Sequence, residues 1–307
     1  MADLVHVVDE VPELAGGSGD AADGPVLVHA LDGFLDAGGA GRILGAQLAD
    51  LAPSRVVASF DLDQLYDYRG RRPALTFDED HYTDYTAPRL VVRVVNDAGG
   101  TPFLVLTGPE PDYQWERFTR AVGDIVERFD VRLTLGLGGV PMAVPHTRPL
   151  LVTTHASQPD LVPEPNVWKG QIRVPASAQA LLELRLGERG HAAMGFVAHV
   201  PHYLAQLDYP DASVALVEQV QRATGLRLEL PDLATLAVAR NAEIAEQVNA
   251  SEEISSAVTA LEEQYDAFAR AAESSLLADD GPLPSAEELG AEFERFLAGI
   301  DPNDERD

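Results

Sequence analysis

Short apolar runs alternate with helical patterns over roughly the first two thirds of the chain. The runs are continuous, which is typical of strands buried on both faces of a sheet. Predicted strands lie at residues 26–31, 56–60, 89–96, 102–107, 131–135, 150–154, 172–174 and 192–198. Predicted helices lie before Pro53, around residues 115–129 and at residues 177–186. This order predicts an α/β sheet flanked by helices, with a hairpin where Asp97-Ala98-Gly99-Gly100 separates two of the strands.

From Asp211 onward the pattern becomes helical only, with helices expected at residues 214–223, 233–248 and 254–272. The last of them carries apolar residues at alternating spacings of four and three, which predicts packing against another helix. Asn249 and Glu252 have the spacing of a capping box at its start. We therefore expect an N-terminal segment and linker (1–24), an α/β core (25–205), a helical subdomain (206–275) and an acidic tail with a short helix (276–307).

Charge narrows the choice of partners. The 307 residues include 50 acidic and 22 basic side chains, a formal net charge of −28, and Lys169 is the single lysine. Because contacts to phosphates need clustered Lys or Arg, we expect no nucleic-acid partner. Residues 241–307 alone hold 18 acidic and 3 basic residues. This excess favours solubility, and an acidic surface for a basic partner remains the alternative.

Several classes of protein and site are disfavoured by what the sequence lacks. No apolar run approaches the roughly 20 residues that span a bilayer, and no basic segment precedes an apolar one at the N-terminus. Cysteine is absent, which excludes disulfides, thiolate zinc sites and cysteine nucleophiles. His199 and His202 flank Pro201 without a recognised ligand spacing. We expect a cytoplasmic protein with no membrane contact, no metal and no cofactor.

Two glycine-rich segments and one carboxylate are the candidates for chemistry. Residues 33–41 join a strand to a helix, where anions bind, but they lack both the P-loop and the dinucleotide patterns, so a tight turn is favoured. Residues 136–139 are expected to form a shaped turn, because Pro141 and Pro145 prevent a helix directly afterwards. Glu110 follows a strand and is either a base or ligand, or more commonly a cap of the following helix.

Four sequence blocks together resemble the bacterial branch of the proteasome-assembly-chaperone family. The first, Asp32-Gly33-Phe34-Leu35-Asp36-Ala37-Gly38, is similar to the family's Gly-aromatic-x-Asp-Ala-Gly signature after the first core strand. The others run from Asp61-Leu62-Asp63 to Arg72-Pro73, from Leu106 to Asp112, and from Gly138-Gly139-Val140-Pro141 to His146-Thr147-Arg148-Pro149. Their order and spacing agree over roughly residues 4 to 270.

The resemblance implies a phosphorylase/hydrolase-like α/β core with a helical C-terminal extension, and a homo-oligomer such as a trimer. It also implies a non-catalytic protein that binds partners, such as proteasome subunits. Some relatives insert a hydrophobic-Tyr-any tail into the proteasome α-ring, whereas this sequence ends Glu305-Arg306-Asp307, so we expect that contact to be absent. The candidate ligand or interface residues are Asp32, Gly33, Asp36, Gly38, Gly108, Glu110, Gly138, Gly139, Pro141, His146 and Arg148.

An enzyme is the alternative. A phosphorylase-like core acting on a nucleoside-like or carboxylate substrate would use Asp36, Glu110 and His146 as its catalytic residues, gathered around one cleft. Fold analogy alone does not choose between the two.

Overall fold

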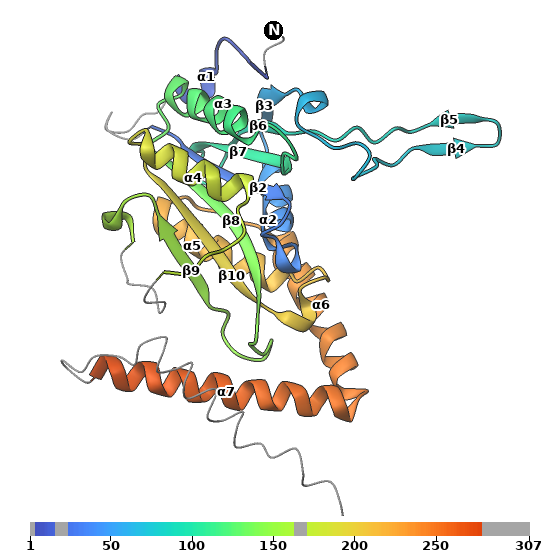
Figure 1. Ribbon diagram of the computed structural model, residues 1–307, viewed down its shortest axis with the longest axis vertical. Helices are drawn as coiled ribbons and strands as arrows, with labels where there is room; N and C mark the ends of the chain where they lie inside the picture. Colours follow the sequence, from blue (N-terminus) through green and yellow to red (C-terminus); the bar gives the residue numbers. More distant parts are fainter. Residues whose placement is uncertain (1–3, 16–23, 163–170, 278–307) are drawn as a thin grey trace, which may run out of the picture.

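A mixed sheet forms the centre of the computed structural model shown in Figure 1, which describes residues 4–15, 24–162 and 171–277. Eight strands lie in the order β1-β3-β6-β7-β2-β8-β10-β9 within this part of the chain. Strands β7, β2, β8 and β10 are parallel, and the flanking strands are antiparallel to their neighbours. The strands are β1 (Val5–Val7), β2 (Val26–Asp32), β3 (Ser54–Phe60), β6 (Val91–Asn96), β7 (Pro102–Pro109), β8 (Leu133–Met142), β9 (Val152–Ala156) and β10 (Ala193–Pro201).

Helices cover both faces of this sheet (Figure 1). The helices are α1 (Pro12–Ala15), α2 (Ala40–Ala49), α3 (Trp115–Arg128), α4 (Ala178–Glu188), α5 (Pro210–Thr224), α6 (Pro231–Asn249) and α7 (Glu252–Leu277). One buried cluster joins α2, α5 and α6 to one face of the sheet, and a second joins α3 and α4 to the other. The prediction of a mixed α/β sheet flanked by helices is therefore confirmed, and so is the β6–β7 hairpin.

The structure corrects two of the predicted elements. Residues 136–139 do not form a turn, because β8 continues through them to Met142 in parallel register with β10. Residues 172–174 form no strand, and Ile172 and Val174 are largely exposed. In both cases tertiary context overrides the local propensity. The glycines at 136–139 lie where another segment approaches β8 closely, and Ile172 and Val174 have no strand beside them to pair with.

Two β elements have no counterpart among the predicted ones. β1 adds the segment around Leu4 and Val5 to the edge of the sheet, next to β3. Strands β4 (Thr76–Asp78) and β5 (His81–Thr83) form a separate antiparallel hairpin that projects from the body (Figure 1).

The C-terminal helices pack one on another. α5 contacts α2 and β10, α6 packs on α5, and α7 packs on α6. The expected capping box at Asn249 is wrong, because Asn249 is the last residue of α6 and the hydroxyl of Ser251 accepts the N–H of Ile254 instead. The short helix expected after Leu283 lies outside the described residues. None of the described helices has a stretch long and apolar enough to cross a membrane.

Candidate functional site

The loop after β2 is held in place by the carboxylate of Asp36. Its Oδ1 accepts the backbone N–H of Gly41 at 2.6 Å, and its Oδ2 accepts that of Arg42 at 3.2 Å, so it binds the first turn of α2. Asp36 also forms an isolated parallel bridge with Gly139 of β8. Burial raises the pKa of Asp36 to about 6, and the nearby charge of Asp32 adds to the rise. The two N–H donors act in the opposite direction, because they stabilise the charged carboxylate.

Glu110 joins this loop to the start of α4. Its carboxylate oxygens accept the backbone N–H of Phe34 at 3.0 Å and that of Ala178 at 2.6 Å. The N-terminus of a helix has free N–H groups and a partial positive charge, and Glu110 satisfies one of these donors. Gly33 lies against this side chain so closely that a Cβ at position 33 would overlap the carboxylate.

Glu110 therefore caps a helix, but not the helix that directly follows it. α3 begins after Gln114, which makes no side-chain capping bond. The neighbouring acid, Asp112, accepts the backbone N–H of Asp67 at 2.6 Å and forms an ion pair with Arg71 at 2.5 Å. Both carboxylates of this segment thus hold loops together.

Glycines of β8 allow the loop to lie directly on the strand. A Cβ at Gly138 would be 2.6 Å from the carbonyl oxygen of Leu35, and one at Gly139 would be 2.6 Å from that of Ala37. These obstacles are backbone atoms, which cannot swing aside as side chains do. Gly108 of β7 has a φ of 140°, and a Cβ at this position would be 2.2 Å from the carbonyl oxygen of Arg89. The glycines are therefore required for close approach of backbone to backbone.

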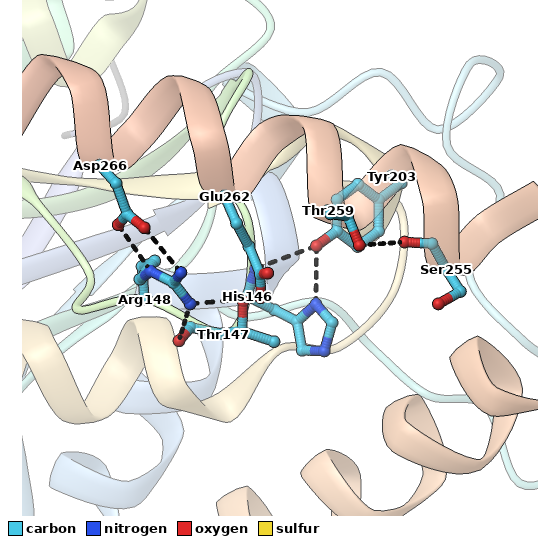
Figure 2. Close-up of polar contacts among 8 residues, drawn as sticks. All are labelled: His146, Thr147, Arg148, Tyr203, Ser255, Thr259, Glu262 and Asp266. Carbon is cyan, nitrogen blue, oxygen red and sulfur yellow. Dashed lines mark hydrogen bonds and ion pairs between the residues drawn. The ribbon is translucent and has the colours of Figure 1, made fainter.

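His146 contacts the turn that follows β10. Its backbone N–H donates to the hydroxyl of Tyr203 at 2.9 Å, and its Nδ1 lies 2.7 Å from the same oxygen (Figure 2). Burial lowers the pKa of His146, only partly opposed by the nearby Glu262 and Asp211.

Arg148 binds α7 to the loop between β8 and β9. Its guanidinium makes two parallel bonds to Asp266, of 2.7 and 2.8 Å, and a third contact of 3.2 Å to Glu262 (Figure 2). Tyr265 of the same helix donates to the carbonyl oxygen of Pro149 at 2.8 Å. This cluster fixes one face of α7 against the body of the protein.

The predicted site residues thus lie in two groups. The first surrounds the loop after β2 and comprises Asp32, Gly33, Asp36, Gly38, Gly108, Glu110, Gly138 and Gly139. His146 and Arg148 belong to the second, at α7, and Pro141 lies in β8, paired with Val200. Two surface cavities, of about 230 and 160 Å³, are lined by other residues.

A row of residues across the sheet has no counterpart among the sequence candidates. His29 of β2 pairs with Gly136, which pairs with Gly195, which pairs with His155 of β9. Both imidazole rings lie over the two glycines, and burial lowers the pKa of His29 to about 4. Only strand register brings these residues together, and the sequence gives no signal for it. In the described part of the chain, no three His, Asp or Glu side chains are grouped as metal ligands.

Comparison with known proteins identifies the family. The model of the PAC2 family matches residues 30–248. The chain belongs to the PAC2 family. No protein of curated function matches it.

Solved structures of other bacterial proteins share this architecture. A Mycobacterium tuberculosis protein of unknown function, Rv2714, is 48% identical, with a TM-score of 0.83 over 88% of this chain and 93% of that one. A Corynebacterium glutamicum protein of unknown function is 38% identical, with a TM-score of 0.80 over 86% of this chain and 97% of that one. Another Mycobacterium tuberculosis protein, the proteasome-assembly chaperone homologue Rv2125, is 25% identical, with a TM-score of 0.69 over 76% and 99% of the chains. The predicted resemblance to proteasome-assembly chaperones is confirmed.

Proposed function

We propose that this protein is a non-catalytic partner-binding protein of the cytoplasm that assists the assembly of a protein complex, with proteasome subunits as its partners. The similarity to a proteasome-assembly chaperone homologue supports the class of partner. As part of the same proposal the protein forms a homo-oligomer, for which a trimer is one candidate, and binds neither nucleic acid nor a membrane. A chain without cysteine is suited to a reducing compartment.

The observation that carries this proposal is the exposure of Phe34 on a loop that is otherwise rigidly held. Its side chain is 60% exposed. Its own backbone N–H is bound by Glu110, and Asp36 anchors the same loop two residues later. A large aromatic ring presented on a fixed backbone loses little entropy on binding, which is typical of the anchor residues of protein interfaces.

The enzyme alternative has less support. Its three catalytic candidates already have structural partners: Glu110 accepts two backbone N–H groups, Asp36 accepts two, and His146 is bound to Tyr203. A thermal-stability screen tests this alternative directly, since a nucleoside or carboxylate at 100 times its Kd would add about 2.7 kcal/mol to the free energy of unfolding.

Binding to purified proteasome α and β subunits from the same host tests the proposal. We expect the wild-type protein to bind a subunit and Phe34→Ala to bind about tenfold more weakly, as for an interface anchor. Leu184→Ala is the matched control, because Leu184 is 55% exposed on α4 and lies outside the loop. Equal affinities of the two variants would remove Phe34 from the interface, and no binding to any subunit would contradict the proposed partner.

A further inference from the structure

Strand β1 forms an open edge of the sheet. Among the described residues its only strand partner is β3, to which it runs antiparallel. The carbonyl oxygen of Leu4 accepts the backbone N–H of Asp61 at 2.9 Å. The N–H of Val8 donates to the carbonyl oxygen of Val57 at the same distance. Because bonded positions alternate along an antiparallel pair, every second residue of β1 is bonded to β3.

The residues in between, Val5 and Val7, direct their backbone groups away from β3. Each offers one N–H and one C=O, and no other described strand lies on that side. Such an edge binds an extended segment as an additional strand. The side chains of Val5 and Val7 pack on the same buried cluster as α3, so one face of an added strand would turn toward α3.

A cavity between β1 and α3 adjoins this edge. Its volume is about 230 Å³, and it is lined by Leu4, Val5, Arg117, Arg120, Ala121 and Asp124. The lining therefore combines apolar side chains with two guanidinium groups, in a chain with a formal net charge of −28.

Neither arginine of the cavity is paired with a carboxylate in the described part of the chain. Arg117 donates to the side-chain oxygens of Gln64 and Gln114, and Arg120 forms no ion pair. Asp124 is engaged at 3.1 Å by an arginine at the C-terminal end of α4. The charge of the two guanidinium groups is therefore available to an anionic ligand.

The spacing of the two arginines fits an extended segment. Arg117 and Arg120 are three residues apart on α3, which places them on one face of the helix with Cβ atoms about 5–6 Å apart. Alternate residues of a strand share a face and are about 6.6 Å apart, whereas adjacent residues point to opposite faces. Two carboxylates at alternate positions of an added strand can therefore reach both guanidinium groups.

We infer that β1 and α3 bind an extended acidic segment of a partner protein, with two carboxylates at alternate positions. The segment adds as a strand to β1 and sets its carboxylates beside Arg117 and Arg120. The acidic C-terminal sequence of this chain is less suited, because Leu289, Phe293 and Phe296 recur at the four-and-three spacing of a helix.

Synthetic peptides test the contact on the full chain. The probe is fluorescein-labelled Thr-Thr-Glu-Thr-Glu-Thr-Thr. Its control is Thr-Thr-Glu-Glu-Thr-Thr-Thr, which has the same composition and charge but adjacent carboxylates. Fluorescence anisotropy should show about tenfold tighter binding of the probe. Equal binding of the two peptides, or binding of neither, would overturn the inference.

Substitution of the arginine tests the cavity. Arg120→Gln should weaken binding of the probe about tenfold. Arg222→Gln is the matched control, because Arg222 is an exposed arginine of α5 that bonds to Gln219 at 3.3 Å and has no carboxylate partner among the described residues. Equal weakening by both substitutions would mean that the probe responds to overall charge and not to this cavity.

Substitution in β1 tests the strand pairing. Val7→Pro removes an outward N–H and leaves the bonds to β3 in place, whereas Val7→Ala keeps the N–H and loses side-chain packing. We expect Val7→Pro to bind the probe about fivefold more weakly than Val7→Ala. Equal affinities would show that the segment does not pair with β1.

Hydrogen exchange distinguishes the alternative occupants. Residues 4–8 should exchange more slowly once the probe is bound. If they are already protected and the probe does not bind, a segment of the chain itself fills the edge. If Arg120→Gln changes the sedimentation of the chain alone, a second copy fills it, and either result overturns the inferred partner. These assays contain no proteasome subunit, so they succeed or fail independently of the binding proposed for Phe34.

Discussion

The carboxylate of Glu110 accepts the backbone N–H of Ala178 at 2.6 Å, which joins the end of β7 to a helix that begins 68 residues later. The other oxygen of this carboxylate holds the N–H of Phe34. One side chain therefore connects the crossover helix on one face of the sheet to the loop that presents the exposed aromatic ring.

Replacement of Glu110 by Gln tests this connection. A neutral amide has one acceptor oxygen instead of two and no charge to favour the helix N-terminus, so we expect a loss of about 1–2 kcal/mol in the free energy of unfolding. Urea denaturation measures it. Glu243→Gln is the control, since Glu243 forms an exposed ion pair with Arg240 in the middle of α6, away from either helix end, and a similar loss in both variants would mean that Glu110 has no special role.

The close approach of loop and strand predicts that Gly138→Ala is destabilising. Its methyl group would meet the carbonyl oxygen of Leu35 at 2.6 Å, so either the loop or β8 must move. Overpacking of this kind costs about 1–3 kcal/mol, and we expect faster amide exchange in residues 33–39. In the control Gly70→Ala, the three atoms nearest to the methyl group all belong to the side chain of Asp67, and none is a backbone atom. Unchanged exchange in the loop would show that β8 does not support it.

Hydrophobic periodicity predicts most elements of this fold because it is a local property. The runs around Val28 and Val105 and the helical spacing around Val122 each indicate a buried element without reference to the rest of the chain. The glycines of β8 show where this reasoning ends. Glycine in isolation favours a turn. Only the position of Leu35 above β8 explains why Gly138 lies within the strand.

The candidate site was harder to predict, because its contacts join distant segments. The choice of helix that Glu110 caps depends on where α4 begins relative to β7, which the strand order sets. The β4–β5 hairpin lacks any apolar alternation on a buried face, so nothing in the pattern around Phe77 indicates strands. Both features follow from tertiary context and not from local sequence.

The raised pKa of Asp36 predicts how the free energy of unfolding depends on pH. Its pKa of about 6 in the folded protein lies above the value near 3.9 of an unfolded aspartate. The folded state therefore binds the proton more tightly, and this stabilisation is present at low pH and is lost as the pH rises through about 6. Relative to Asp36→Asn, which cannot titrate, the wild type should lose about 1 kcal/mol between pH 5 and pH 8. Thermal unfolding of both proteins in the same buffers measures this difference. A constant difference across that range would contradict the raised pKa.

The contacts of Arg148 lead to a prediction about the local stability of α7. Its two parallel bonds to Asp266 and the contact to Glu262 are the charged contacts between this helix and the loop that follows β8 (Figure 2). Arg148→Lys keeps the charge but loses the planar fork, so we expect α7 to exchange its amides faster while the sheet is unaffected. Hydrogen exchange with mass spectrometry resolves the two regions.

A second pair of variants separates the contact from the charge. Arg240→Lys removes a guanidinium that pairs only within α6, and it should leave exchange in α7 unchanged. Exchanging the partners, as Arg148→Asp with Asp266→Arg, should restore part of the protection lost in Arg148→Asp alone, because the ion pair forms again with its direction reversed. If the double variant exchanges as fast as the single one, the bond to Asp266 does not hold the helix, and α7 depends on its packing against α6.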